Sequence, residues 1–345
     1  MLTGPASGDG GPTEADWAAA VAAVRGLSAE ARVLLICHVN PDGDALGSML
    51  GFGLGLRRLG VRRLQATFPG PPELPESLRW LPGADLLVPA VEAYPDPDLV
   101  ICFDAASESR LGELVDRLDT AGAALVLDHH ASNTRFGGIH LVDPRAAATS
   151  VVAGELLARL DVPLDAEIAV GLYVALTTDT GSFRFEATTP AVHRLAARLL
   201  ATGINPGDIS RRVFDTRPFG AVQLFGEVLL RARLEPAAAA GHGLVWTYAT
   251  LDDLARHDQR PYVLEALIDS VRCTAEADVA CVLKQVAADE WAVSMRSKGA
   301  VDVSRVAVAL DGGGHRFAAG FTGRGGVEEV VGRIRARLDE ALTAH

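Results

Sequence analysis

The chain has 345 residues, 49% of them hydrophobic and 22% charged, and at the usual size of about 100–200 residues per domain this length predicts two domains. The composition excludes the collagen-like, intrinsically disordered and disulfide-scaffold classes. The 32 Lys and Arg residues against 44 Asp and Glu residues give a net charge of −12, which argues against tight, sequence-independent binding of long nucleic acid.

The N-terminal residues are not expected to form a targeting segment. Residues 1–13 are rich in Gly and Pro, lack the basic and apolar regions of a signal peptide, and are expected to form a disordered tail. No apolar run reaches the roughly 18 residues of a membrane-spanning helix, so no membrane association is expected. The four cysteines show no C-x-x-C spacing, which favours a reduced, cytoplasmic protein.

The N-terminal part alternates between strand and helix patterns. Short apolar runs at 33–37, 99–103 and 124–127 are typical of strands buried on both faces, and helical patterns lie between them at 45–59 and 111–121. This alternation predicts βαβ units and a parallel sheet that binds ligands at its carboxyl edge. Further helices are expected at 150–160, 165–177, 190–202, 206–214 and 221–230.

A second domain is expected after a change in composition. A stretch of small residues at 235–241 marks the end of a helical linker over 216–240. Strands at 244–249, 278–286 and 291–296, followed by helices at 303–310 and 327–342, then predict a smaller α+β domain over 241–345.

Metal-ligand residue types follow one predicted strand after another. His38, Asp42 and Asp44 come after the first strand, Asp104 after the second, and the run Asp128-His129-His130 after the third; Asp179 closes a predicted helix. Each alone is typical of a turn or a helix cap. Five carboxylates and three imidazoles at one sheet edge would, however, repel one another unless divalent cations held them together.

The sequence therefore predicts a two-metal centre. Carboxylate and imidazole ligands without thiolate favour Mn²⁺, and Mg²⁺, Fe²⁺ and Co²⁺ fit the same ligand types. Two such ions at a separation of ~3.5–4 Å clamp a phosphoryl group and convert a bridging water into hydroxide.

These residues carry a resemblance to a known family. In matching order, four segments resemble motifs I to IV of the DHH phosphoesterase superfamily: His38-x-x-Pro-Asp-x-Asp-Ala-x-Gly-Ser48, Asp104, Asp128-His-His130 with Asn133, and Asp179-Thr-Gly-Ser182. The segment Gly312-Gly-Gly-His315-x-x-Ala-Ala-Gly320 resembles the signature of the DHHA1 domain. The resemblance covers most of the chain from about residue 31, and it is greatest to the bacterial type that degrades short oligoribonucleotides and dephosphorylates 3′-phosphoadenosine 5′-phosphate.

The resemblance implies a fold and a set of metal ligands. The fold is α/β, with a parallel-sheet DHH domain and flanking helices over 14–215, a DHHA1 domain over 241–345, and an active site in the cleft between them. His38 and Asp42 are implied to bind one Mn²⁺, and Asp44, His129 and Asp179 the other. Asp104 is implied to bridge both ions.

Further residues are implied to act in catalysis or substrate binding. Asp128 would orient the ligands by hydrogen bonding, and His130 would face the phosphate. In the second domain, glycines allow backbone N–H groups to turn inward around an anion. The residues expected to hold a phosphate or a 3′-terminal nucleotide there are Arg296, Ser297, Gly313, Gly314 and His315, and Asn133 and Arg110 are weaker candidates in the first domain.

The expected function is that of a Mn²⁺-dependent phosphohydrolase with two Mn²⁺ per chain, with Mg²⁺ or Co²⁺ as substitutes. Its expected substrates are short RNA, dinucleotides such as pApA or cyclic di-AMP, and 3′-phosphoadenosine 5′-phosphate, and relatives suggest a homodimer. Three alternatives remain: a family II inorganic pyrophosphatase, which lacks the signature at 312–315; a RecJ-like single-strand exonuclease, disfavoured by the −12 charge; and a non-enzymatic nucleotide sensor, disfavoured by the complete set of metal-binding residues.

Overall fold

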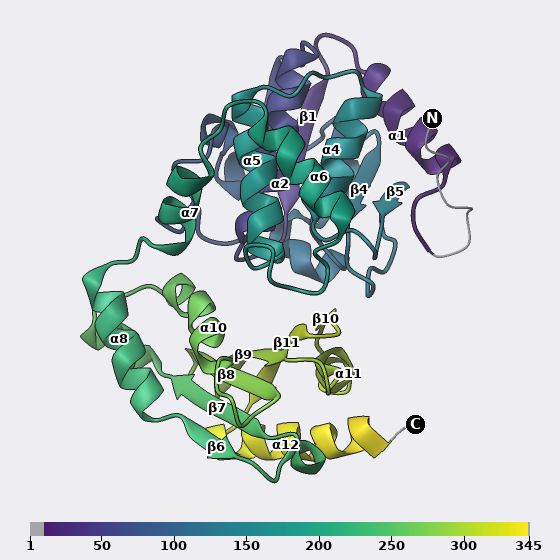
Figure 1. The fold of residues 1–345 in the computed structure, drawn as a ribbon. Coiled ribbons are helices and arrows are strands. Elements are labelled where there is room, and N and C mark those ends of the chain that lie inside the picture. Colours follow the sequence, from purple (N-terminus) through teal and green to yellow (C-terminus); the bar gives the residue numbers. More distant parts are fainter. Residues whose placement is uncertain (1–9, 344–345) are drawn as a thin grey trace. The chain divides into compact units, whose positions relative to one another are not determined.

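The computed structural model describes residues 10–343, so the first nine residues of the expected tail lie outside the described residues. The chain divides into two compact units, Met1–Thr216 and Arg217–His345, which we describe separately (Figure 1). Within the described part, no helix is both long enough and apolar enough to cross a lipid bilayer.

The first unit is built on a five-stranded parallel sheet. Its strands are β1 (Arg32–Cys37), β2 (Arg63–Thr67), β3 (Leu99–Phe103), β4 (Ala124–Asp128) and β5 (Ile139–Val142), in the order β2-β1-β3-β4-β5. The three central strands were predicted. The edge strands β2 and β5 were missed, because their residues are only partly buried and include Arg, Gln and His.

Both faces of this sheet are covered. Alternate residues of β1 point to opposite sides, with Val33 and Leu35 in one apolar cluster and Leu34 and Ile36 in another. The first cluster includes residues of α1 (Glu14–Arg25), α2 (Gly43–Arg58), α4 (Thr149–Arg159), α5 (Ala166–Asp179), α6 (Pro190–Leu200) and α7 (Pro206–Phe214). The second lies under η2 (Ala90–Glu92) and η3 (Glu108–Leu114).

The prediction of one continuous helix over 111–121 is wrong. The segment forms η3 and then the separate short helix α3 (Asp116–Thr120). Gly112 has φ +49° and ψ −130°, a conformation that interrupts a helix and that glycine adopts readily.

A close crossing of α2 and α5 fixes the helix layer. A Cβ atom at Gly47 in α2 would clash with the carbonyl oxygen of Gly171 in α5, and one at Gly171 would lie 2.7 Å from the carbonyl oxygen of Gly47. Both positions therefore require glycine. The crossing aligns the start of α2, which carries Asp44, with the helix that ends at Asp179.

The second unit contains a six-stranded mixed sheet. Its strands are β6 (Arg233–Glu235), β7 (Leu244–Ala249), β8 (Val279–Ala287), β9 (Glu290–Ser297), β10 (Gly313–His315) and β11 (Ala318–Arg324), in the order β10-β11-β9-β8-β7-β6. Only β7 and β8 pair in parallel. The predicted fold class, a parallel-sheet domain followed by a smaller α+β domain, is confirmed.

Helices lie on both sides of the second sheet. One apolar cluster joins the sheet to α8 (Phe219–Leu230), α9 (Leu251–Arg256), η5 (Pro261–Ala266) and α10 (Leu267–Val271). The cluster on the opposite face includes residues of η4 (Ala239–Gly241), α11 (Val303–Val308) and α12 (Val327–Thr343). Helix α8 occupies the first half of the segment expected to be a helical linker.

Candidate active site

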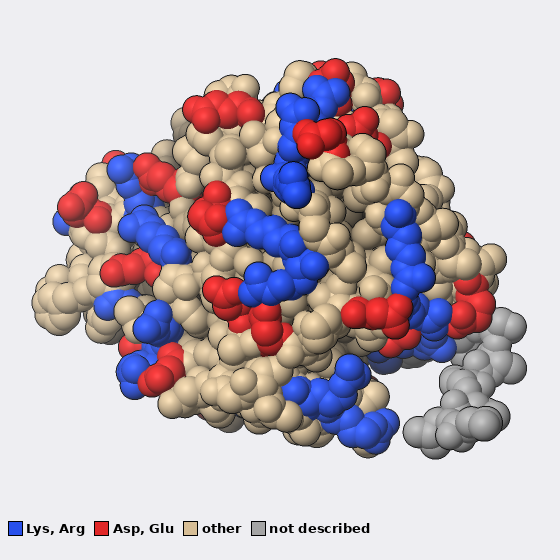
Figure 2. All heavy atoms as spheres, turned by 90° about the horizontal axis from the view of Figure 1, so that it is seen from above, with Lys and Arg blue, Asp and Glu red and all other residues tan. Residues whose placement is uncertain are grey.

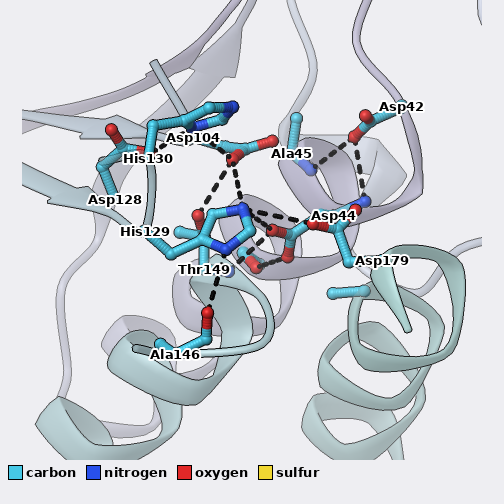
Figure 3. A network of polar contacts seen from close by, with 12 residues as sticks. Asp42, Asp44, Ala45, Asp104, Asp128, His129, His130, Ala146, Thr149 and Asp179 are labelled. Carbon is cyan, nitrogen blue, oxygen red and sulfur yellow. Dashed lines mark hydrogen bonds and ion pairs between the residues drawn. The ribbon is translucent and has the colours of Figure 1, made fainter. Parts of the chain in front are cut away.

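The predicted metal-ligand side chains of the first unit gather at the carboxyl edge of its sheet (Figure 3). His38 directly follows β1, Asp104 directly follows β3, and Asp128 is the last residue of β4. Parallel strands end at the same edge, which is why residues far apart in the sequence meet here.

One group of potential ligands consists of His38, Asp42 and Asp104. Nε2 of His38 lies 3.4 Å from a carboxylate oxygen of Asp104 and 3.9 Å from one of Asp42. Nδ1 of His38 donates to the carbonyl oxygen of Val39 at 2.8 Å, which leaves the lone pair on Nε2. The Asp42 side chain is 58% exposed and also caps α2, since it accepts the N–H groups of Asp44 and Ala45.

A second group consists of Asp44, His129 and Asp179. Nε2 of His129 lies 3.1 Å from a carboxylate oxygen of Asp179 and 3.6 Å from one of Asp44. Nδ1 of His129 donates to the carbonyl oxygen of Ala146 at 3.1 Å. This hydrogen bond fixes the tautomer that presents Nε2 to the carboxylates, as metal-binding histidines require.

Asp104 joins the two groups. Its Oδ2 atom faces His38, while its Oδ1 atom lies 3.5 Å from Nε2 of His129 and 3.6 Å from Nδ1 of His130. The residue is buried and has φ +57°, a left-handed conformation that is uncommon outside glycine. Strain of this kind is found at functional sites, where the surrounding structure enforces it.

Thr149 also belongs to the centre, although the sequence did not reveal it. Its hydroxyl donates to Oδ1 of Asp104 at 3.0 Å, and its backbone N–H donates to Oδ2 of Asp44 at 2.6 Å. The N–H of Ser150 and the hydroxyl of Ser48 also donate to Asp44. Asp44 thus caps the N-terminus of α4, whose own N-cap residue, Ala148, has no side-chain acceptor.

The crowded charges shift the ionisation of the centre. Burial, followed by the carboxylates of Asp104 and Asp179, raises the pKa of Asp44 well above its usual range. Burial opposes the charged form of His129, but the neighbouring carboxylates outweigh it and raise the pKa of that imidazole well above its usual range. For Asp104, burial is outweighed by the three imidazoles, which lower its pKa. Without a metal ion, the centre therefore holds protons that an ion would displace.

A chain of hydrogen bonds positions His130. Its Nδ1 lies 2.8 Å from Oδ1 of Asp128, and the side-chain amide of Asn133 donates to the other oxygen of Asp128 at 2.6 Å. The same amide donates to the carbonyl oxygen of Ala105. Asp128 is fully buried, and its hydrogen bond to Nδ1 holds the His130 imidazole in one orientation.

The weaker candidate Arg110 lies at the edge of the centre. Its guanidinium is 3.2 Å from Nδ1 of His38, and its carbonyl oxygen accepts the N–H of Val39. Arg110 therefore fixes the loop that follows β1.

In the second unit, the predicted substrate-binding residues lie at one end of the sheet. Arg296 and His315 are both paired with Ala318 of β11, so they share one face. Ser297 follows Arg296 directly and is on the opposite face, where its hydroxyl donates to Asp278 at 2.7 Å. The structure thus places Arg296 and His315 on one face, on the two strands that flank β11, and Ser297 on the other face.

The glycine-rich segment forms a strand. Gly313 and Gly314 belong to the edge strand β10, which pairs with β11. Gly314 has φ +136°, and a Cβ atom there would lie 2.6 Å from the carbonyl oxygen of Ala318. Close approach of two backbones therefore explains this glycine.

The residues of the first unit fit divalent cations. Within each three-residue group the ligand atoms lie within 4.8 Å of one another, and the two groups are linked by Asp104. Oxygen and imidazole nitrogen atoms are the donors that Mn²⁺, Mg²⁺ and Co²⁺ accept. The side chains that the sequence indicated as candidate ligands thus lie together at one place in the first unit.

Known families and proteins match both units. Residues 32–176 match the DHH family, N-terminal domain, and residues 246–344 match the DHHA1 domain. The chain is 35% identical over 315 residues to the bifunctional oligoribonuclease and PAP phosphatase NrnA of Thermus thermophilus, covering 91% of each chain. It is 25% identical over 307 residues to the Bacillus subtilis protein of the same name, covering 86% of this chain and 91% of that relative.

A solved structure supports the fold. The exopolyphosphatase-related protein of Bacteroides fragilis superposes with a TM-score of 0.82 and 23% identity, covering 96% of this chain and 97% of that one. Together, the fold, the assembled acid and histidine groups and the extended sequence identity show that the chain belongs to the DHH family, carries a DHHA1 domain in its second unit, and is a hydrolase of phosphate esters.

Proposed function

We propose that this enzyme degrades short oligoribonucleotides and dinucleotides to mononucleotides and removes the 3′-phosphate of 3′-phosphoadenosine 5′-phosphate (PAP) to give AMP. The relatives from Thermus thermophilus and Bacillus subtilis bear both activities in their names. The observation that carries the proposal is the meeting of two ligand groups at Asp104, in a chain whose likeness to the Thermus enzyme extends over 91% of its length.

The metal part of the proposal assigns two Mn²⁺ ions to the centre, with Mg²⁺ or Co²⁺ as substitutes. His38 and Asp42 would hold one ion, Asp44, His129 and Asp179 the other, and Asp104 both. Such a pair supplies a hydroxide nucleophile and neutralises charge on the phosphoryl oxygens. Thr149 keeps the shared carboxylate in place through its hydrogen bond to Oδ1.

His130 is proposed to contact the phosphate. Its Nδ1 is held by Asp128, which supports a role for Nε2 as the atom that faces the substrate. A protonated imidazole stabilises developing negative charge, and the pKa of His130 supports this role: burial lowers it, but hydrogen bonding and the charge of Asp128 outweigh burial and raise it.

The second unit is proposed to recognise the part of the substrate that is not attacked. Arg296 and His315, which share one face of its sheet, would hold a terminal phosphate or nucleotide, with Ser297, Gly313 and Gly314 nearby in sequence. An Arg side chain binds phosphate in a bidentate manner. We include pApA and cyclic di-AMP among the candidate substrates, and we propose a homodimer in the cytoplasm.

One comparison tests this proposal. The purified enzyme, stripped of metal and refilled with Mn²⁺, is offered a diribonucleotide, PAP, cyclic di-AMP and pyrophosphate, and kcat/KM is measured for each. We expect the diribonucleotide and PAP to have the highest values and the stripped enzyme to be inactive.

Two results would contradict the proposal. A preference for pyrophosphate would establish the pyrophosphatase alternative. Binding of PAP without turnover by the enzyme refilled with Mn²⁺ would establish the nucleotide-sensor alternative.

A further inference from the structure

One face of the second sheet carries a row of small and cationic side chains. Directly paired residues of neighbouring strands share a face. Three rows of paired residues cross the strands. In the first row, Ala318 of β11 lies between His315 and Arg296, and in the second, Gly320 of β11 lies between Gly313 and Ser294. In the third row, Ala292 of β9 lies between Thr322 and Lys284. Lys284 and Ser294 are therefore on the same face as Arg296 and His315, and we call this set the polar sheet face.

The polar sheet face is partly exposed at β9, whereas on β8 its residues Ala280 and Val282 are buried against the helices. Ala292, Ser294 and Arg296 are each half-buried, whereas the intervening residues of β9 are buried on the other side of the sheet. The β11 residues paired with Arg296 and Ser294 are Ala318 and Gly320, which have no side-chain atoms beyond Cβ. Ser294 and Arg296 are two residues apart, which places them about 7 Å apart along the strand.

Lys284 is a lysine in an arginine-rich chain, and it is buried. The chain has 30 arginines but only two lysines, Lys284 and Lys298. Lys284 is 7% exposed, and its Nζ atom donates to Oε2 of Glu265 at 2.6 Å and to Oγ of Ser294 at 2.9 Å. A compact ammonium group suits this position on a sheet, where a planar guanidinium would need more room.

The partner of Lys284 is a carboxylate that is easily released. Glu265 lies in η5, and its side chain is 61% exposed, so water solvates it once the ion pair opens. An ammonium group donates three hydrogen bonds, and Glu265 and Ser294 accept two. A phosphate monoester carries nearly two negative charges and three acceptor oxygens, so it competes well with one carboxylate.

We propose that Lys284 and Ser294 bind the phosphate group of the substrate that is not attacked, and that Glu265 occupies the lysine when this phosphate is absent. The ligand is a terminal phosphate monoester, such as the 5′-phosphate of PAP or of a short RNA. This inference rests on the proposed function. It makes Lys284 a specificity-determining residue in addition to Arg296 and His315.

The test compares two substrates that differ only in that phosphate. PAP carries a 5′-phosphate, and adenosine 3′-phosphate does not. The measured quantity is the ratio of kcat/KM for PAP to that for adenosine 3′-phosphate. We expect Lys284→Met to lower this ratio about 10- to 100-fold, the effect of one lost charge-assisted hydrogen bond. We expect Glu265→Gln to raise it, because the competing charge is gone.

Lys298→Met is the matched control. Its Nζ atom donates to the carbonyl oxygen of Thr274, and the side chain is exposed, so this variant should keep the wild-type ratio. An unchanged ratio in Lys284→Met, or a fall in Glu265→Gln, would show that the pair is only structural and would overturn the inference. Thermal unfolding of each variant verifies that it is folded.

A binding measurement separates this inference from the proposed function. If the wild-type enzyme turned over neither substrate, the proposed function would fail by itself. Calorimetry with 5′-AMP and adenosine would then decide the inference: weaker 5′-AMP binding in Lys284→Met and stronger binding in Glu265→Gln support it, and equal affinities in all three proteins refute it.

Discussion

Asp44 shows how single residues of the centre also hold the fold together. Its carboxylate accepts N–H groups from the start of α4 and the hydroxyl of Ser48, and it faces His129 across the candidate metal position. A substitution of Asp44 would therefore disturb α4 and the centre together. Thr149 contacts Asp104 through its side chain and Asp44 through its backbone. A substitution of Thr149 can therefore change the centre without removing the hydrogen bond that supports α4.

Thr149→Val should weaken metal binding without unfolding the unit. The valine keeps the backbone N–H that donates to the Asp44 carboxylate but lacks the hydroxyl that donates to Asp104. Loss of such a supporting hydrogen bond typically costs about 10- to 100-fold in metal affinity. Titration calorimetry with Mn²⁺ measures the effect. Thr149→Ser, which retains the hydroxyl, is the control, and wild-type affinity in Thr149→Val would exclude this role.

At the level of elements, the crossing of α2 and α5 fixes the position of Asp44, near the start of α2, relative to Asp179, at the end of α5. Gly47→Ala should lower the thermal midpoint, since the new methyl group meets the backbone of Gly171, and overpacking of this kind costs about 1–3 kcal/mol. It should also weaken Mn²⁺ binding, because α2 carries Asp44.

Gly154→Ala in α4 is the matched control. The nearest atom to its new Cβ would be a Leu172 methyl carbon at 3.7 Å, an ordinary contact, and alanine favours the helix by roughly 1 kcal/mol over glycine. This variant should therefore be as stable as wild type or slightly more so. Equal stability of both variants would mean that α2 and α5 can move apart freely.

A buried ion pair connects elements of the second unit. Asp253 of α9 accepts two hydrogen bonds from Arg231, at 2.7 and 3.1 Å, and its side chain is 3% exposed. Burial raises the pKa of this carboxyl, but Arg231 and the N–H of Thr250 outweigh burial and lower it. Because the pKa of Asp253 is lower in the folded protein than in the unfolded chain, the ion pair stabilises the fold at a pH above the unfolded pKa of about 3.9. This stabilisation is lost as the pH falls through the pKa that Asp253 has in the folded protein.

Asp253→Asn should therefore lower the unfolding midpoint most at pH 6–8. The difference from wild type should shrink as the pH is taken from about 4 towards 2. Thermal unfolding of both proteins across this range measures it, and a difference that grows with acidity would contradict the sign of the shift.

The strands that could be predicted from the sequence are those that are buried on both faces. Strands β1, β3 and β4 are covered on both faces and appear as unbroken apolar runs, while β2 and β5 at the edges do not. The predicted helix over 111–121 failed because periodicity does not show the positive φ of Gly112.

The same reasoning explains what was and was not predictable about the centre. His38 and Asp104 directly follow buried strands, so the topology alone brought them together. Thr149 was missed because a threonine at a helix start has no distinguishing pattern. Lys284 was missed because its position on the same sheet face as Arg296 becomes visible only when the pairing of β8, β9 and β11 is known.

For the whole molecule, net charge limits the kind of substrate. The chain carries a charge of −12, and on the face drawn in Figure 2 the Lys and Arg side chains are interspersed with Asp and Glu. Tight binding of long nucleic acid needs many basic contacts with phosphates. This distribution favours short substrates that are bound through the metal centre.

Turnover should accordingly fall as the RNA grows longer. We expect kcat/KM to decrease steeply beyond a few nucleotides and to depend only weakly on salt concentration, because few counterions are released. Rates on oligoribonucleotides of two to twenty-four nucleotides, measured at low and high salt, provide the check. Equal rates on short and long strands would revive the exonuclease alternative.

The most direct test of the central claim, that Asp104 links two metal ions into one catalytic centre, is the metal content and activity of Asp104→Ala beside Asp128→Ala. Loss of the shared carboxylate should leave fewer than two Mn²⁺ per chain and abolish turnover of PAP, while Asp128→Ala, which removes only a positioning group, should keep both ions at saturating Mn²⁺. Two bound Mn²⁺ and wild-type turnover in a folded Asp104→Ala protein would contradict the account.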